Sequence, residues 1–290
     1  MPRRLPLVLA ALAAAVAVGV VLLLAGGKDT VPVSTVAKAA EATSTSGGFK
    51  FELNGSIKLA QGNPVPIKGS GAIDPATRRG RLLFDSAGPL AGAAASNQKI
   101  EQIFEGEVIY MKMPAIAQRL GAKAKWLKVD IAEAGRALGV DPAQFGQLGS
   151  NDPRRMLDQI RSVSGDIEKL GSAKVRGADT TRYRAEVDLR KYPERLPEKD
   201  REQARVSVER LIDQTGSATY PMELWIDDDD LVRRVRVSYD FEGAQKASFA
   251  MTMEFFEFGT AIDVAPPPAR DVQDLAELAR SLPAGAGQTQ

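Results

Sequence analysis

Apolar and polar side chains alternate along three segments near the C-terminal end of the chain, and this alternation constrains the fold most strongly. In a β-strand successive side chains point to opposite faces, so an alternating segment forms a strand with one apolar face. Regular polar partners are typical of an antiparallel sheet that is solvated on one side. We expect the second and third segments to share one apolar face. The apolar members of the three segments are Tyr220, Met222, Leu224 and Ile226; Val235, Val237, Tyr239 and Phe241; and Phe249, Met251, Met253 and Phe255.

The same pattern predicts further strands before these three. Residues 49–59 and 181–189 alternate in the same way, and Glu105-Gly106-Glu107 is typical of a tight hairpin turn. Shorter strands are predicted at residues 67–73, 79–85, 100–104, 108–113, 125–130 and 167–173.

Helical patterns are fewer. Ser34 is a suitable N-cap for a short helix through Ala42, and residues 197–214 form one amphipathic pattern. A short helix is also expected over residues 271–282, after the three prolines 266–268. In the middle of the chain, helices are predicted at residues 131–138, 142–148 and from Asp152-Pro153 onward. Strands with a few helices between them give the α+β class.

The N-terminus predicts export. Two arginines precede an apolar stretch from Leu5 to Ala25, and those 21 positions are enough to cross a membrane as a helix. Residues 1–27 are therefore a signal peptide cut after Gly27, which would give a secreted protein, or an uncleaved membrane anchor. Cleaved apolar regions usually span only about 7–15 residues, which favours the anchor. Either way, the remainder is expected outside the cytoplasm.

Composition excludes several chemistries. The sequence has no cysteine and no histidine, which removes disulfides, thiolate nucleophiles, imidazole bases and zinc sites built on nitrogen or sulfur. Its 38 basic and 37 acidic residues leave no basic excess for nucleic acid. No phosphate loop, dinucleotide fingerprint or Gly-x-Ser-x-Gly motif is present. We therefore expect no enzyme, no catalytic residue, no cofactor and no metal.

Four motifs in order carry a resemblance to a known family. They are Trp126 to Asp130, the stretch from Val175-Arg176-Gly177 to Arg184, Leu224 to Asp227, and Phe258-Gly259 with Pro266-Pro267. Over roughly residues 33–275 the chain resembles the LppX/LprG-type lipoproteins of actinobacteria, whose fold is similar to that of LolA and LolB. The resemblance implies a curved, mostly antiparallel half-barrel whose concave face is covered by helices over an apolar cavity.

Two positions depart from the family pattern. Leu24-Ala25-Gly26-Gly27 resembles a lipobox in which Gly27 replaces the acylated cysteine, so the usual thioether-linked lipid cannot form. Asp230 replaces a glycine common in the turn after the Trp-Ile-Asp strand, at little cost if that turn tolerates a positive φ.

The candidate site is the apolar lining of that cavity. Methionine adapts to irregular shapes, which suits acyl chains of variable length, whereas the alternative interpretation of the same side chains is an ordinary solid core. The candidate lining residues are Phe84, Met111, Met113, Val235, Val237, Tyr239, Phe249, Met251, Met253 and Phe255.

Three other features each have two interpretations. The carboxylates Asp227 to Asp230 suit calcium, but a hairpin turn explains them with less. Arg233, Arg234 and Arg236 suit anionic head groups, but their strand positions favour a solvated face. Residues 88–96, rich in alanine and glycine, form either a flap over the cavity mouth or a surface loop.

These observations predict a carrier or chaperone for acylated lipid or glycolipid, acting in envelope lipid trafficking at the outer face of the cytoplasmic membrane. Residues 28–270 would form its LolA-like domain and residues 271–290 a tail with a short helix. We expect a monomer, with an envelope transporter as a further partner. The alternative is an envelope sensor or protein-interaction module built on the same half-barrel, without lipid.

Overall fold

The computed structural model describes residues 35–59, 63–86, 98–114, 117, 122–130, 133, 167–191, 193–195, 198–241, 246–275, 277 and 278. The N-terminal apolar segment and the loop at residues 88–96 lie outside the described residues. So do the predicted helices at 131–138, apart from Glu133, at 142–148 and from residue 152. Within the described part, no helix combines the length and apolar character needed to cross a membrane.

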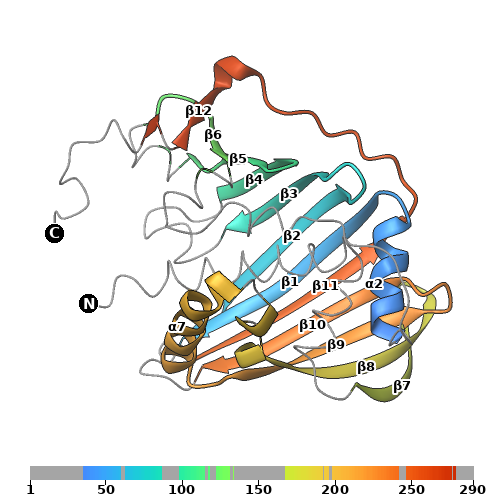
Figure 1. Ribbon diagram of the computed structural model, residues 1–290. Helices are drawn as coiled ribbons and strands as arrows, with labels where there is room; N and C mark the ends of the chain where they lie inside the picture. The colour runs from blue at the N-terminus through green and yellow to red at the C-terminus, as the bar shows by residue number, and fades with distance from the viewer. Residues whose placement is uncertain are drawn as a thin grey trace.

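The described residues form one large, curved, open sheet (Figure 1). Its order is β12-β6-β5-β4-β3-β2-β1-β11-β10-β9-β8-β7, and every neighbouring pair is antiparallel except β12 with β6. The predicted curved, mostly antiparallel sheet is therefore confirmed. The strands are β1 (Phe49–Leu59), β2 (Val65–Asp74), β3 (Arg79–Ser86), β4 (Gln98–Glu105), β5 (Val108–Lys112), β6 (Trp126–Asp130), β7 (Glu168–Val175), β8 (Ala178–Asp188), β9 (Thr219–Asp227), β10 (Val232–Phe241), β11 (Ala247–Phe256) and β12 (Val272–Asp274).

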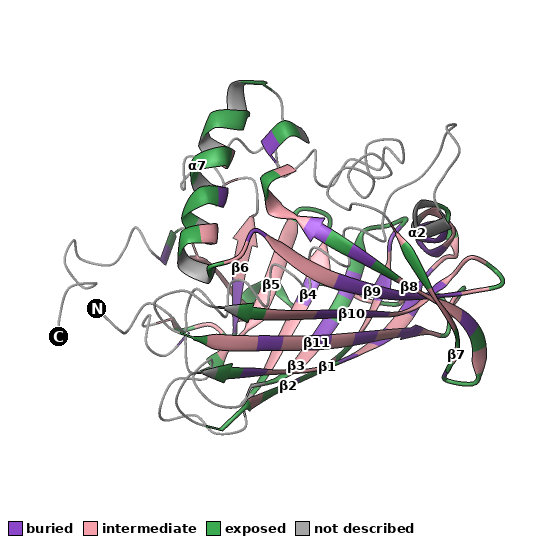
Figure 2. Ribbon diagram, turned by 90° about the horizontal axis from the view of Figure 1, so that it is seen from below, coloured by how far each residue is buried: buried purple, intermediate pink, exposed green. Residues whose placement is uncertain are grey.

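The register of the long strands follows the alternation of the sequence. Val235 faces Met253 and Val237 faces Met251 across the β10–β11 pair, as expected from the alternation. Along β11, buried and half-buried residues alternate, which Figure 2 shows as bands across the strand. Because cross-strand partners point to the same side, the odd-numbered residues of β1, β10 and β11 share one face. We call this the inner face and the opposite one the outer face.

Two helices lie on the same side of the sheet, at opposite ends of the central strands (Figures 1 and 2). Helix α2 (Thr35–Thr45) precedes β1, and its Ala39 is fully buried in the apolar cluster of the inner face. The buried Thr43 hydroxyl accepts a hydrogen bond from the Val232 amide at 2.9 Å, and Lys38 pairs with Asp230 at 2.5 Å. Helix α2 is thereby fixed to the β9–β10 turn.

Helix α7 (Glu198–Thr215) lies beside the other ends of the strands and contacts β10. Two short 3-10 turns, η2 (Leu189–Lys191) and η3 (Pro193–Arg195), connect β8 to it. Gly216 ends the helix with a φ of +77°, and its amide donates to the Ile212 carbonyl. This is a common helix ending, because glycine adopts the left-handed conformation without strain.

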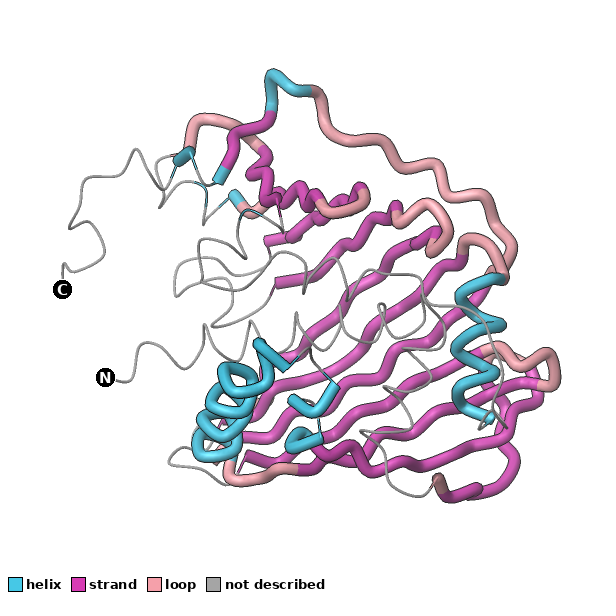
Figure 3. Tube along the Cα trace, in the orientation of Figure 1, coloured by secondary structure: helices cyan, strands magenta, loops and turns pink. Residues whose placement is uncertain are grey.

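The C-terminal helix prediction is wrong at its start. After β11 a long loop runs along the ends of the strands to the far edge of the sheet (Figure 3), where η4 (Ala269–Asp271) leads into β12. Val272 pairs with Trp126 in parallel register, and the Gln273 side chain accepts a hydrogen bond from the Lys123 amide at 3.1 Å. These long-range partners override the local helical pattern, so helical residues begin only at Leu275.

Candidate functional site

The inner face brings most of the predicted site residues together. Six of them are buried in one apolar cluster with exposed fractions between 0 and 8%. Phe84 and Tyr239 are partly buried and pack against the same cluster. Seven of the described strands, β1, β2, β3, β8, β9, β10 and β11, contribute buried residues to this surface of alkyl, thioether and aromatic groups, and Ala39 of α2 is buried against it. The six buried residues are Val235, Val237, Phe249, Met251, Met253 and Phe255.

Met111 and Met113 lie farther along the sheet. Successive cross-strand partners share one face of the sheet, so the inner face can be followed across it. From Gly71 on β2 the partners are Leu82 on β3, Gln102 on β4, Met111 on β5 and Leu127 on β6. There Leu127 belongs to a second, smaller cluster with Ala117 and Leu278. Met113, two residues beyond Met111, is half-buried just after the end of β5. The structure thus places Met111 on the same face as the others, but outside the main cluster.

Three glycines that the sequence prediction omitted lie in the middle of the inner face. Gly55 on β1 pairs with Met251, and Gly69 and Gly71 on β2 pair with Leu53 and Phe51. A β-carbon at Gly71 would stand 2.6 Å from a ring carbon of Phe51, and one at Gly69 would stand 2.9 Å from the ring of Phe84.

Aromatic rings therefore lie over glycines that offer no side chain of their own. The signal was present in the sequence, because Gly69 and Gly71 are two residues apart in a predicted strand and must share a face.

Two tyrosines mark the end of the inner face near the start of β9. The rings of Tyr220 and Tyr239 meet edge to face, with centroids 5.9 Å apart. The Tyr239 hydroxyl donates to the Ser217 carbonyl at 2.7 Å, just after α7. Burial, with a smaller contribution from Tyr239, raises the pKa of the Tyr220 phenol. This end of the face is therefore apolar but carries hydroxyl groups.

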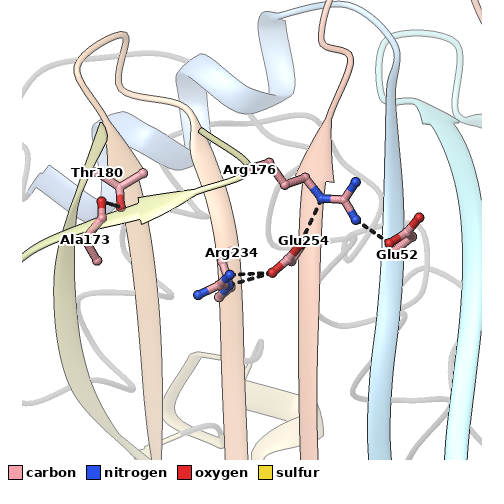
Figure 4. A network of polar contacts seen from close by, with 6 residues as sticks. All are labelled: Glu52, Ala173, Arg176, Thr180, Arg234 and Glu254. Atoms are coloured by element: carbon pink, nitrogen blue, oxygen red, sulfur yellow. Dashed lines mark hydrogen bonds and ion pairs between the residues drawn. The ribbon is translucent and has the colours of Figure 1, made fainter. Parts of the chain in front are cut away.

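The outer face carries charged side chains that lie over the rings of Trp225 and Phe256. At the tip of the β7–β8 hairpin, Arg176 has a φ of +48° and Gly177 a φ of +87°, as in the primed turns of two-residue hairpins. The tip curls over the outer face, and the Arg176 guanidinium donates to Glu254 on β11 at 2.9 Å and also pairs with Glu52 on β1 (Figure 4). Arg234 donates to the same Glu254 from β10. One hairpin thus connects strands far along the sheet.

A second charged group surrounds Trp225, which is only 5% exposed. The guanidinium carbons of Arg182 and Arg234 each lie 5.2 Å from its ring centroid, a cation–π geometry. Arg182 and Arg184 both donate to Glu223 at 2.8 Å. Partial burial alone would raise the pKa of Glu223, but the hydrogen bonds from the two arginines outweigh it and hold the pKa below its ordinary value.

The same balance lowers the pKa of Glu254: burial opposes the shift, and hydrogen bonds from Arg234 and Arg176 bring it about. Arg233 pairs with Asp227, and Arg236 is exposed on the outer face. Two of the three arginines considered for head groups are therefore held by carboxylates.

The run of aspartates forms a turn. The Asp227 side chain accepts hydrogen bonds from the amides of Asp229 and Leu231, and Asp230 adopts a φ of +59°. The hairpin interpretation is therefore confirmed, and Asp230 does occupy a conformation that favours glycine. No group of three or more acidic residues in the described part is arranged to hold a metal ion.

No family model matches the chain. A curated relative, an uncharacterized 31.2 kDa protein from the rplA–rplJ intergenic region of Streptomyces griseus, is 27% identical over 255 residues, covering 84% of this chain and 80% of the relative. Among solved structures, the chain is similar to the lipoprotein LppX of Mycobacterium tuberculosis, with a TM-score of 0.45 and 10% identity over 80% of this chain and 96% of that one.

It is also similar to LprF from Mycobacterium bovis, with a TM-score of 0.41 and 13% identity over 81% of this chain and 98% of that one. A LolA-superfamily protein from Nitrosomonas europaea gives a TM-score of 0.28 and 6% identity over 80% of this chain and 93% of that one. At these values the likeness assigns no function to this chain.

Proposed function

We propose that the protein binds acylated lipid or glycolipid outside the cytoplasm and acts as a carrier or chaperone in envelope lipid trafficking. The observation that carries the proposal is the inner face, where one side of a large open sheet is apolar across β9, β10, β11, β1 and β2. Gly55, Gly69 and Gly71 contribute no side chains in the middle of that face, where the rings of Phe51 and Phe84 lie over Gly71 and Gly69. Lipid would lie against the inner face, and the N-terminal segment would hold the sheet at the outer surface of the cytoplasmic membrane.

The size of the face suits an acyl chain. From β9 to β2 there are four strand spacings, about 19 Å at roughly 4.8 Å each. This is comparable with half of a hydrocarbon core of about 30 Å, which is the depth one acyl layer spans. Each buried methylene contributes about 0.8 kcal/mol, so a chain of a dozen carbons supplies on the order of 10 kcal/mol before the cost of ordering it.

The inner-face groups act by excluding water rather than by chemistry. Thioethers such as those of Met251 and Met253 adapt to chains of different length and shape. Phe84 is partly buried beside Gly69 and packs against the buried cluster, where its ring would border the bound chain. The sequence resemblance to LppX/LprG-type lipoproteins points to the same class of ligand.

The test uses the whole chain and a photoactivatable phospholipid whose acyl chain carries the reactive group. Adducts are quantified by peptide mass spectrometry within residues 35–278, which separates the sheet from the N-terminal apolar segment. Met251→Trp adds volume on the inner face without introducing charge, and we expect it to abolish these adducts while the protein stays folded. The matched control is Ala250→Trp, which is next to it in the chain but on the outer face. Equal labelling of the two variants would reject the inner face as the binding surface.

A further inference from the structure

Within the part of the chain that the structure describes, the Tyr220 hydroxyl is a hydrogen-bond donor without a partner on the largely apolar inner face. Its ring packs against the inner-face cluster. Among the described residues no hydrogen bond reaches its hydroxyl, whereas the neighbouring Tyr239 donates to Ser217. Tyr220 is half-buried and its hydroxyl is not fully enclosed, so a bound molecule can reach it.

The surroundings of Tyr220 define which ligand atom would suit it. Its partner on β8 is Val187, its edge-to-face neighbour is Tyr239, and the partner of Tyr239 on β11 is Phe249. The Tyr220 phenol is neutral at neutral pH, as an ordinary tyrosine is, and burial raises its pKa further. A neutral donor among apolar groups matches a neutral acceptor better than a phosphate or a carboxylate, since a charge would have to be desolvated there.

An acylated lipid carries such an acceptor at the junction between its chain and its polar part. The ester carbonyl joins the apolar chain to the polar glycerol or sugar, so it must lie where an apolar surface gives way to water. Tyr220 occupies this kind of position, because it lies near the first residue of β9 and close to the end of α7. The glycines Gly55, Gly69 and Gly71 lie several strands away, on β1 and β2.

We propose that Tyr220 donates a hydrogen bond to the ester carbonyl of the bound lipid and thereby sets the direction in which the lipid lies. The ester and head group are at the α7 end of the inner face, and the acyl chain extends across β10 and β11 toward the glycines of β1 and β2. This inference rests on the proposed function, since it concerns the ligand of the same face.

The experiment compares two competitors of the same chain length, diester and diether phosphatidylglycerol. Both displace the photoactivatable phospholipid from the whole chain, but only the diester offers a carbonyl. One neutral hydrogen bond predicts that the diester competes about two- to tenfold better in the wild type. Tyr220→Phe should bring the ratio close to one, with adducts still formed within residues 35–278. Tyr110→Phe is the control: it removes a phenol hydroxyl from the outer face of the sheet, on β5, and should keep the diester preference.

The outcomes separate the two proposals. A wild-type chain without diester preference, or a Tyr220→Phe variant that keeps it, overturns the role of Tyr220 while labelling of the sheet still supports lipid binding. A wild-type chain without adducts in the sheet overturns the proposed function itself. A lower melting temperature for Tyr220→Phe would also contradict the inference, because removing an unpaired hydroxyl should leave stability unchanged or raise it.

Discussion

Replacing Arg176 by alanine tests whether the hairpin tip fastens the outer face of the sheet. The guanidinium pairs with Glu52 and Glu254 and lies 4.0 Å from the ring centroid of Phe256. Alanine removes all three contacts and, like arginine, is strained at the positive φ of this position. Glycine would relieve that strain and so confuse the result. Glu254 keeps Arg234 as a partner, so the substitution leaves no buried carboxylate unpaired.

The expected loss follows from the exposure of these groups. The Arg176 side chain is 35% exposed and that of Glu52 is 47%, so solvent screens much of their attraction. An exposed ion pair contributes about 0.2–1 kcal/mol and an exposed cation–π contact about 0.5–1 kcal/mol. We therefore expect Arg176→Ala to lower the free energy of unfolding by about 1–2 kcal/mol. For a chain of this size that corresponds to roughly 2–8 °C in the melting temperature.

The assay is thermal and urea unfolding of the whole chain, with Lys174→Ala as the matched control in the same hairpin. Among the described residues Lys174 pairs only with Asp179, at 2.6 Å, and both side chains are largely exposed, at 66% and 75%. That pair should contribute at most a few tenths of a kcal/mol. The difference between the two variants should shrink in high salt. If Arg176→Ala lowered the free energy of unfolding no more than Lys174→Ala does, the long-range contacts of the hairpin tip would not stabilise the sheet.

Two further predictions concern the two faces of the sheet. Val237→Asp buries an unpaired carboxylate on the inner face and should cost about 3 kcal/mol or more, whereas Ser238→Asp, on the outer face, should cost less than about 1 kcal/mol in urea unfolding. Equal losses would contradict the register. Glu223 and Glu254 have pKa values in the folded state below the ordinary 4.5. Their stabilisation is therefore complete above about pH 4.5 and is lost as the pH falls through the lowered values. The double variant with glutamine at both positions should show a weaker loss between pH 5 and pH 3 than the wild type; an identical acid profile would disprove the linkage.

Strand alternation made the sheet predictable because it is a local property. Each of the long strands begins and ends within a few residues of its expected bounds, and the pairing of Val237 with Met251 follows from parity. Parity also put the candidate site residues on one face, including Met111, which is far from the main cluster. Whether that face holds a lipid does not follow from parity, since a lining and a solid core need the same side chains.

Long-range pairing explains what could not be predicted. The strand at Val272–Asp274 exists because Trp126 and its neighbours offer a sheet edge to it, and no local signal marks that edge. Nothing in the sequence around Arg176 indicates its partners. The hairpin curls over the outer face and brings Arg176 to Glu254 and Glu52. The strand position of Tyr220 was predicted, but its hydrogen bonding was not. The structure shows that the Ser217 carbonyl accepts from Tyr239 and that no described residue pairs with the Tyr220 hydroxyl.

Lipid binding by the inner face is tested most directly by finding where lipid contacts this chain in its own membrane. Cells expressing the whole chain would be fed a photoactivatable, clickable fatty acid, irradiated, and the purified protein analysed for the positions of its adducts. Lipid binding by the inner face predicts adducts on β10, β11 and β1, at or next to residues such as Val237, Met251 and Leu53. Adducts confined to residues 1–34, or none at all, would contradict it and would favour a protein-interaction module built on the same sheet.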